Sequence, residues 1–270
     1  TTVLVRLPLD GEDIYLGDGD QYWALGTMRY DSSPGLETAT GELVTVGPAD
    51  GMADATDLFF QIALAGNGDG TITQNEQSYG SYFGRQNQWL TELPPEERRR
   101  YLMEAASQLA QGAAPQSDLV TDFESYPSTT QFTASVDQFA VRDGDHLYLT
   151  LPVPEYQLDL ELPGTDSREH PLHWHSPQRQ TVRMTVDLPK EFQTVLLSPP
   201  AIEWAAPAGA GTVTVTTTQN EDNPSQLIVE YVIDLDAAII PAADYAELLD
   251  IQAQLSHPSS RTVVLTRAAE

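Results

Sequence analysis

The stretch from residue 53 to residue 152 constrains the fold of this chain more than any other part of the sequence. An apolar-rich run at residues 57–65 meets the turn-forming sequence Asn67-Gly68-Asp69-Gly70, and a second run follows at residues 71–79. Because asparagine, aspartate and glycine adopt turn conformations readily, these two runs are predicted to form a β-hairpin. An isolated hairpin is marginal in water, so the neighbouring sequence is expected to cover it.

A helical insert is predicted near residues 82–111. Residues 82–93 suit a short helix, and Pro94-Pro95-Glu96-Glu97 is typical of a helix start, where proline fits the first turn and acidic side chains favour the positive end of the helix dipole. Apolar residues then recur at helical spacing as far as Leu109, and Gly112 is expected to end the helix. A similar stripe predicts a late helix near residues 241–256.

The remaining sequence is rich in short strand-like runs separated by turn residues. We expect strands at 3–9, 13–16, 42–46, 117–126, 132–141, 146–151, 180–188, 193–197, 211–218, 226–235 and 262–265. Residues 21–41 lack a steady period and are predicted to be an irregular connector. The fold class is therefore mostly β (α+β): an antiparallel β-sandwich, or one larger super-sandwich, with the two helical pieces added.

Two regions are expected along the chain. Residues 1–47 form a hairpin and connector, and residues 48–270 form the sandwich region, with a candidate subdivision at 152–154, where Pro152-Val153-Pro154 interrupts the pattern.

Charge excludes several kinds of partner. The 270 residues carry 40 acidic and 13 basic side chains, for a net charge of −27. Such a surface repels nucleic-acid phosphates and anionic lipids, so neither is an expected partner. It either attracts cations and basic partners or, as the commoner case, is simply a solvated acidic surface. No apolar run approaches the ~18 residues of a membrane span.

The beginning of the chain shows no secretory signal pattern. Because the sequence starts at Thr1 without Met, a processed protein or an excised piece is expected. Cysteine is absent, which removes disulfides and thiolate nucleophiles from this chain.

Three histidines and one turn are candidate metal sites. His170, His173 and His175 cluster, and an H-x-H pair with a third histidine is a known way to hold zinc. The alternative is a surface loop or edge strand bracketed by prolines. The hairpin turn also matches part of a calcium loop through Asn67, Asp69, Gly70, Ile72 and Glu76, but Ala65 stands where its first aspartate should be. A plain turn is the favoured interpretation, and no metal or cofactor is predicted.

Other charged and aromatic residues allow a second class of function. The acids Asp10, Glu12, Asp13, Asp18 and Asp20 crowd the N-terminal turns, where they are either turn formers or carboxylates that act on sugars. The run Arg98-Arg99-Arg100 is either an anion site or a solvated helix face. Trp23, Trp89, Trp174 and Trp204 are candidate sugar-stacking residues. A carbohydrate-binding or carbohydrate-active β-sandwich is therefore the alternative function.

The order of several features resembles one family. The matching pieces are Val3-Leu4-Val5 through Asp10-Gly11 to Tyr15-Leu16, then Asp20-Gln21-Tyr22 and Gly26; Leu58 through Asp69-Gly70, Gly80 or Gly84, Arg85 and the Pro94 helix; and Arg168, Pro171 and the helix at 241–255. This order is similar to bacterial transglutaminase-like proteins, which carry uncharacterised β-sandwich domains on both sides of a papain-like Cys-His-Asp core.

The resemblance implies the tail of such a core, at residues 1–47, followed by its C-terminal sandwich. The family nucleophile is a cysteine, which this chain lacks, and the position of the triad aspartate is Gly17, with Asp18 one residue away. The family histidine would fall at or before Thr2. We therefore expect no catalytic residues in this chain and no enzymatic activity. The resemblance implies a periplasmic or extracellular accessory module that supports a neighbouring domain or binds a protein partner.

Overall fold

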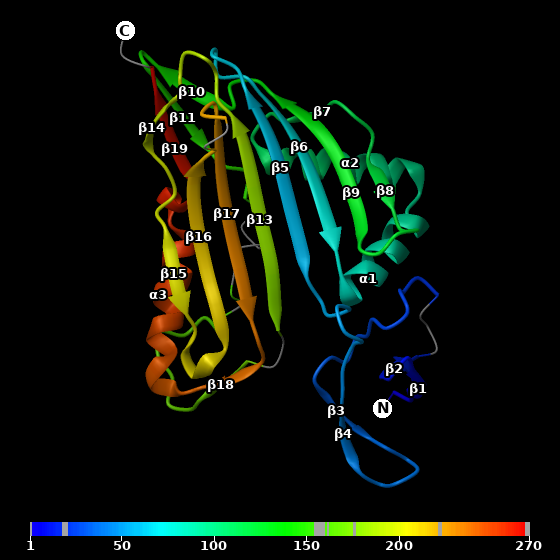
Figure 1. Cartoon of the computed structure of the whole chain (residues 1–270). Helices are drawn as coiled ribbons and strands as arrows, with labels where there is room; N and C mark the ends of the chain where they lie inside the picture. Colours follow the sequence, from blue (N-terminus) through cyan, green and yellow to red (C-terminus); the bar gives the residue numbers. More distant parts are fainter. Residues whose placement is uncertain are drawn as a thin grey trace.

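One large sheet forms the centre of the molecule. The computed structural model describes residues 2–17, 21–153, 160, 162–174, 177–220 and 223–267. The nine-stranded sheet has the order β15-β16-β17-β13-β5-β6-β9-β7, with β8 also paired to β9 (Figure 1). Its strands are β5 Thr56–Leu64, β6 Gly70–Ser78, β7 Ala114–Pro115, β8 Val120–Asp122, β9 Ser128–Val136, β13 Gln178–Asp187, β15 Ile202–Ala205, β16 Gly211–Gln219 and β17 Gln226–Leu235.

A parallel strand pair joins the two halves of this sheet. β13 runs parallel to β5, from Gln180 beside Thr56 to Asp187 beside Ala63, whereas the other strand pairs of the sheet are antiparallel. The expectation of purely antiparallel sheets is therefore wrong at this pair. Strands before and after residues 152–154 consequently share one sheet.

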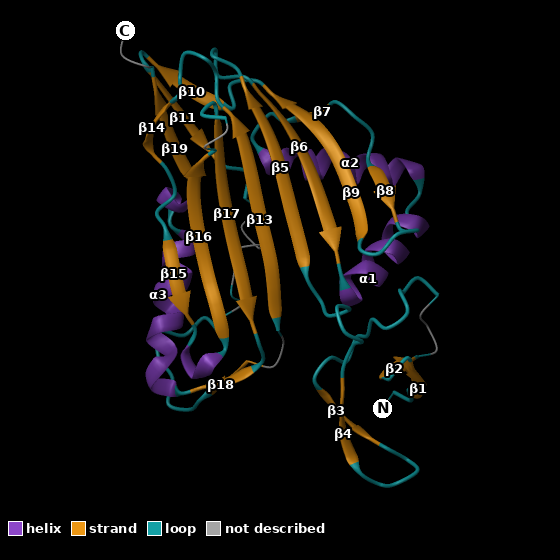
Figure 2. Cartoon of the chain, in the orientation of Figure 1, coloured by secondary structure: helices purple, strands orange, loops and turns teal. Residues whose placement is uncertain are grey.

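The two faces of the nine-stranded sheet differ. Successive side chains of a strand point to opposite faces, so Leu58, Phe60 and Ile62 of β5 lie in the core while Phe59 and Gln61 lie on the other side. Helices cover only the core side, as Figure 2 shows. These are α1 Gly80–Glu92, α2 Pro95–Leu109 and α3 Tyr245–Ser256. We call the uncovered side the open face.

A four-stranded sheet completes the covering layer. Its order is β10-β11-β19-β14, with β10 Ala140–Asp143, β11 His146–Thr150, β19 Thr262–Thr266 and β14 Thr194–Leu197. Side chains from this sheet, such as Leu147 and Leu265, share one buried apolar cluster with Leu58 of the large sheet, Leu102 of α2 and Leu248 of α3. The layers therefore pack around a single hydrophobic core. A short pair, β12 Leu172–Trp174 with β18 Ala238–Ile240, lies beside it.

The N-terminal segment, residues 2–50, contains two separate hairpins in its described parts, 2–17 and 21–50. β1 Val5–Leu9 pairs with β2 Glu12–Leu16, and β3 Ser33–Leu36 pairs with β4 Leu43–Val46. The segment attaches to α1, where the Trp23 ring lies so close to Gly84 that a Cβ there would come within 2.3 Å of it. Asn87 Nδ2 also donates to the Tyr22 carbonyl oxygen at 2.9 Å.

Most expected elements are confirmed. The helices at 82–111 and 241–256 correspond to α1, α2 and α3, and the mostly β fold class is observed. Three further expectations are wrong in part. Part of the connector at 21–41 forms β3, because it pairs with β4, and the strand expected at 117–126 shortens to β8. The strand expected at 132–141 divides between β9 and β10, with residues 137–139 between them. No helix in the described ranges has the length and apolar character to span a membrane.

Candidate functional site

A cavity of about 560 Å³ lies where α2 ends, between the large sheet and β11. Its floor is apolar and is made by Leu109, Val136, Phe139, Leu151 and Val153, each of which is buried. The end of α2, the turn from β9 to β10 and the residues after β11 bring these side chains together. We call this space the α2–β11 cavity.

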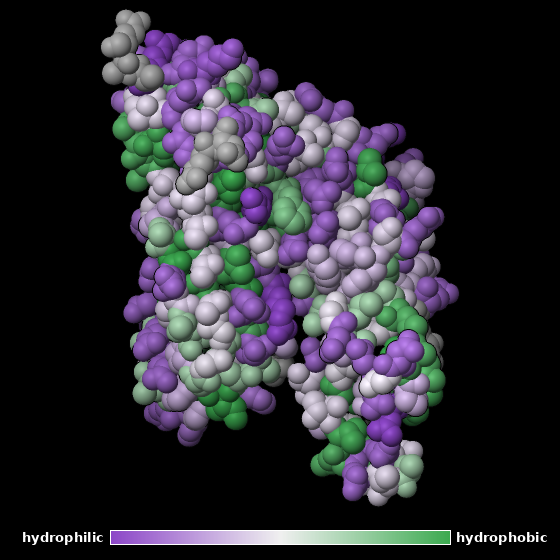
Figure 3. Space-filling view, in the orientation of Figure 1, coloured by the Kyte–Doolittle hydropathy of each residue, from purple (hydrophilic) through white to green (hydrophobic). Residues whose placement is uncertain are grey.

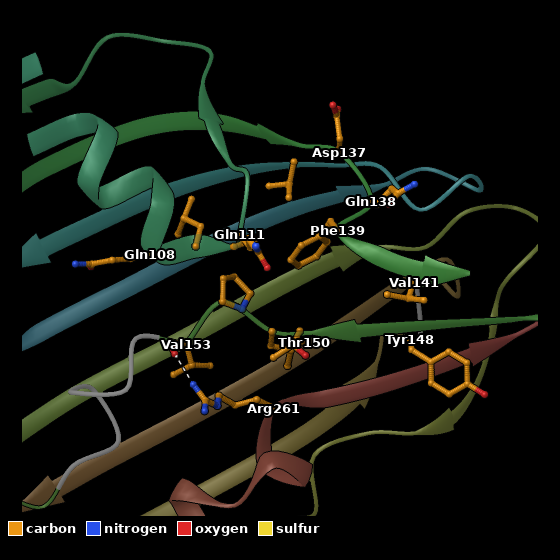
Figure 4. A pocket seen from close by; sticks show the side chains of 15 residues that line it. Gln108, Gln111, Asp137, Gln138, Phe139, Val141, Tyr148, Thr150, Val153 and Arg261 are labelled. Atoms are coloured by element: carbon orange, nitrogen blue, oxygen red, sulfur yellow. Dashed lines mark hydrogen bonds between the residues drawn. The ribbon is translucent and has the colours of Figure 1, made fainter. Parts of the chain in front are cut away.

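Polar groups line the rim of the α2–β11 cavity. Figure 4 shows the Gln111 side chain turned toward the cavity beside the Phe139 ring, whereas Asp137 and Tyr148 point away. Arg261 is the one basic residue among the described lining residues, and its Nη1 donates to the Val153 carbonyl oxygen at 3.3 Å. This arrangement suits a ligand with an apolar group and one hydrogen-bonding group.

The described lining of this cavity lacks the residues most often used in covalent catalysis. Among the described residues it includes no serine, cysteine or histidine, and its single described carboxylate, Asp137, points away from the cavity. Nucleophilic catalysis requires a nucleophile within hydrogen-bond reach of a base, and the described lining offers no such pair.

A second polar cluster lies where β6 meets α1. Glu76 accepts hydrogen bonds from Gln86 Nε2 at 2.9 Å and Ser78 Oγ at 3.3 Å, and Ser128 Oγ donates to Gln86 Oε1 at 3.2 Å. Burial raises the pKa of the Glu76 carboxyl, and the two hydrogen bonds oppose that shift. These hydrogen bonds join α1 to β6. The burial of the Glu76 carboxyl disfavours its charged form.

A tyrosine beside this cluster is also perturbed. The Tyr79 hydroxyl donates toward Asp57 Oδ2 and Gln77 Oε1, both at 3.1 Å. Burial, together with the nearby Asp57 charge, raises the pKa of Tyr79 to about 12. The hydroxyl therefore stays protonated at neutral pH and acts as a hydrogen-bond donor.

The histidines do not form a described metal site. His170 is exposed in a bend, and His173 lies on the exposed side of β12, opposite the buried Trp174. His175 lies outside the described residues. In the ranges that the structure covers, no group of three or more histidine, aspartate or glutamate residues is placed to hold a metal ion.

The partial calcium motif is a hairpin turn. Asn67 Nδ2 donates to Asp69 Oδ2 at 2.6 Å, and the Gly68 carbonyl oxygen accepts from Ala140 N at 2.8 Å. Gly70 begins β6, and Glu76 lies six residues further along this extended strand, about 20 Å away. A calcium loop would have to fold Glu76 back toward Asp69, which the strand prevents.

The N-terminal acids lie on an exposed hairpin. Asp10 is in the turn between β1 and β2, Asp13 lies 3.6 Å from Arg6, and Glu12 Oε2 accepts from Asp50 N at 3.3 Å. Asp18 and Asp20 fall outside the described residues, next to Gly17. The described acids thus act as turn and surface residues.

The three arginines of α2 have different roles. Arg98 donates to Thr121 Oγ1 at 2.8 Å and so ties α2 to β8. Arg100 pairs with Glu97 and with Glu104, and Arg99 is exposed. The solvated-face interpretation therefore holds for Arg99 and Arg100 and is wrong for Arg98.

The four tryptophans are not brought together. Trp23 packs on Gly84 with Arg29 over its ring, Trp89 of α1 meets Tyr101 edge-on, and Trp174 is buried. Trp204 of β15 packs against the core. They cannot form a shared stacking platform for one sugar chain.

Sequence reasoning missed the residues that line the α2–β11 cavity and the open face. Gln111, Phe139 and Arg261 come from three separate elements, and no local motif links them. The sequence does contain one relevant pattern. Where apolar and polar residues alternate along a strand, the polar residues are the ones that face away from the core, on the open face.

Comparison with known proteins finds an uncharacterised domain. Residues 145–265, from the start of β11 into β19, match the family model of DUF3858, a domain of unknown function with a solved structure. No curated protein sequence gives a significant match.

One similar solved structure is the crystal structure of a "putative protease" from Parabacteroides distasonis. The identity is 12% and the TM-score is 0.49 over 97% of this chain. The chain spans 35% of the length of that protein.

Proposed function

We propose that this chain is a non-catalytic accessory module of a larger transglutaminase-like protein, placed beside a papain-like core. One observation carries the proposal: the N-terminal segment leaves most of its large apolar side chains uncovered. In the part of the chain that the structure describes, it holds more than half of the exposed large hydrophobic side chains. These are Val3, Val5, Leu7, Leu9, Leu16, Leu25, Tyr30, Leu36 and Leu43.

The exposure is large for residues of this kind. Val3 is 81% exposed, Leu36 is 63% exposed and Leu43 is 78% exposed. Soluble domains rarely leave contiguous apolar surface in water unless a partner covers it. Two-stranded hairpins also need such cover to be stable. A neighbouring core that packs on both hairpins would supply it.

The chemistry of the chain supports the non-catalytic part of the proposal. The sequence contains no cysteine, and the described residues that line the α2–β11 cavity include no nucleophile–base pair. The module would position the core or bind its partner. The resemblance alone supports a location outside the cytoplasm.

The proposal is tested by two assays on the purified chain. Incubation with casein or with amine donors should give neither cleavage nor cross-linking, and turnover that survives repurification would refute the non-catalytic role. In parallel, a dye that fluoresces on apolar surface should bind the chain. Replacement of Val5, Leu36 and Leu43 by serine should remove most of this signal, whereas Met103→Ser on α2, also exposed, should remove little.

A further inference from the structure

A second hollow, of about 460 Å³, lies on the open face of the nine-stranded sheet, across β13, β5, β6 and β9. It is separate from the α2–β11 cavity and from the N-terminal segment. Figure 3 views the molecule from this side, and hydrophilic and neutral residues predominate over β5, β6 and β9.

Two cross-strand rows line the hollow. In the first row, Arg183 of β13 lies beside Phe59 of β5, Phe59 beside Asn75 of β6, and Asn75 beside Gln131 of β9. Neighbouring strands are about 4.8 Å apart, so this row extends over about 14 Å. The sheet therefore presents a fixed line of one aromatic ring, two amides and one guanidinium.

The second row adds groups of the same chemistry. Thr185 lies beside Gln61 and Gln61 beside Thr73, and these three residues line the hollow. Thr133, beside Thr73, adjoins it. The Thr73 and Thr133 hydroxyls are 3.0 Å apart. Amide and hydroxyl groups can donate and accept, and they carry no charge.

One acceptor in the hollow lacks a donor. Asn75 Nδ2 donates to Gln131 Oε1 at 3.3 Å, but Asn75 Oδ1 is shielded from solvent and finds no hydrogen-bond donor among the described residues. Polar atoms in such positions are usually paired, so a rotation of the Asn75 side chain toward the hollow would make this unused acceptor available to a donor on a ligand.

The charge of the hollow restricts the ligand further. Arg183 is the one charged residue in the described lining of the hollow, and Glu230 lies 3.5 Å away and balances its charge. The chain as a whole carries −27, which disfavours polyanions. Protein interfaces concentrate aromatic and apolar residues at their centres, whereas this hollow offers one half-buried aromatic ring among amides and hydroxyls.

We propose that the open-face hollow binds a neutral oligosaccharide. The Phe59 ring offers a face to the apolar side of a sugar ring, and Asn75, Gln131, Gln61 and the threonines exchange hydrogen bonds with its hydroxyls. Arg183 donates from one end of the row. This site does not depend on the accessory role, because it uses neither the N-terminal segment nor a neighbouring core.

Isothermal titration calorimetry with soluble glucan, xylan and mannan oligosaccharides tests the proposal, with an oligouronate as the charged counterpart. We expect one neutral series to bind and the oligouronate to give no heat. The double variant Asn75→Ala with Gln131→Ala should raise the Kd at least about tenfold, because two hydrogen-bonding side chains are lost. Thr212→Ala, exposed at the far end of β16, should leave the Kd unchanged.

Thermal unfolding separates a binding defect from a folding defect. The side chains of Asn75 and Gln131 lie outside the core, so the melting temperature of the double variant should stay close to that of the unaltered chain. The proposal is overturned if no neutral series binds at millimolar concentration, if only the oligouronate binds, or if the double variant binds as tightly as the unaltered chain.

Discussion

The N-terminal segment and the nine-stranded sheet contain similar alternating strand sequences but differ in what covers them. Leu58 and Ile62 of β5 are fully buried, whereas Leu7 and Leu9 of β1 are each 40% exposed. The few buried residues of the N-terminal segment, Ile14 among them, lie outside the main apolar cluster. Alternation therefore predicts a strand, but burial depends on whether another layer is present.

The largest expected effect contrasts one leucine from each region. Leu58→Ala should lower the free energy of unfolding by about 2–5 kcal/mol, because it leaves a cavity in a closed core. Leu7→Ala, on the exposed β1, should change it by no more than about 0.5 kcal/mol. Urea denaturation of both variants measures this contrast. Equal losses would show that the N-terminal segment is packed as firmly as the sheet.

A smaller effect is expected where the two regions meet. Gly84→Ala places a methyl group against the Trp23 ring and should loosen the N-terminal segment by about 1–3 kcal/mol. Amide hydrogen exchange at residues 21–28 should then accelerate by about 5- to 150-fold. Global stability should change less, because alanine favours the helix over glycine.

Gly164→Ala is the matched control for this contact. A Cβ at Gly164 would meet no atom within 4 Å. The exchange at residues 21–28 should be the same as in the unaltered chain. If Gly84→Ala also leaves it unchanged, Trp23 does not hold the segment in place.

The smallest expected effect concerns the buried Glu76 carboxyl on the covered side of the sheet. Its pKa in the folded protein is raised above the ordinary value of 4.5. Between these two pKa values the folded state therefore binds more protons than the unfolded state. The contribution of the Glu76 carboxyl to the free energy of unfolding consequently falls as pH rises from 4.5 through the folded pKa. Glu76→Gln keeps an acceptor oxygen for Gln86 and should remove this loss, so the variant should be more stable at pH 7.

Chemical denaturation from pH 4 to pH 8 measures this effect. The difference between the Glu76→Gln variant and the unaltered chain should grow with pH through that window. Glu203→Gln, exposed on β15, should follow the unaltered chain at every pH. If Glu76→Gln destabilises the protein at pH 7, the favourable interactions of the charged carboxylate exceed the desolvation penalty of its burial.

Local sequence signals were sufficient for much of the fold. Residues 180–188 alternate between apolar and polar side chains and form most of β13, and Pro95 begins α2 as its position predicts. Strand partners could not be predicted in the same way, because pairing joins residues far apart in the chain. The parallel pair of β13 and β5 and the pairing of Pro34 in β3 with Thr45 in β4 both depend on such contacts.

The candidate sites were less predictable than the strands. The row from Arg183 through Phe59 and Asn75 to Gln131 exists only because four strands adopt one register. Histidines and acids were the candidate metal ligands and catalytic residues, because histidines are rare and acids are charged. Most of the described ones lie in turns or on the surface. Neutral amides and threonines are common on strands, so only their arrangement identifies a site.

The accessory role is tested most directly by hydrogen exchange at β1 to β4 in two settings. The first is the isolated chain, and the second is the same chain within its complete reading frame. If a papain-like core packs on the N-terminal segment, the amides of β1 to β4 should exchange quickly in the isolated chain and become protected in the longer protein. A reading frame that encodes no such core, or equal exchange in both settings, would contradict the account.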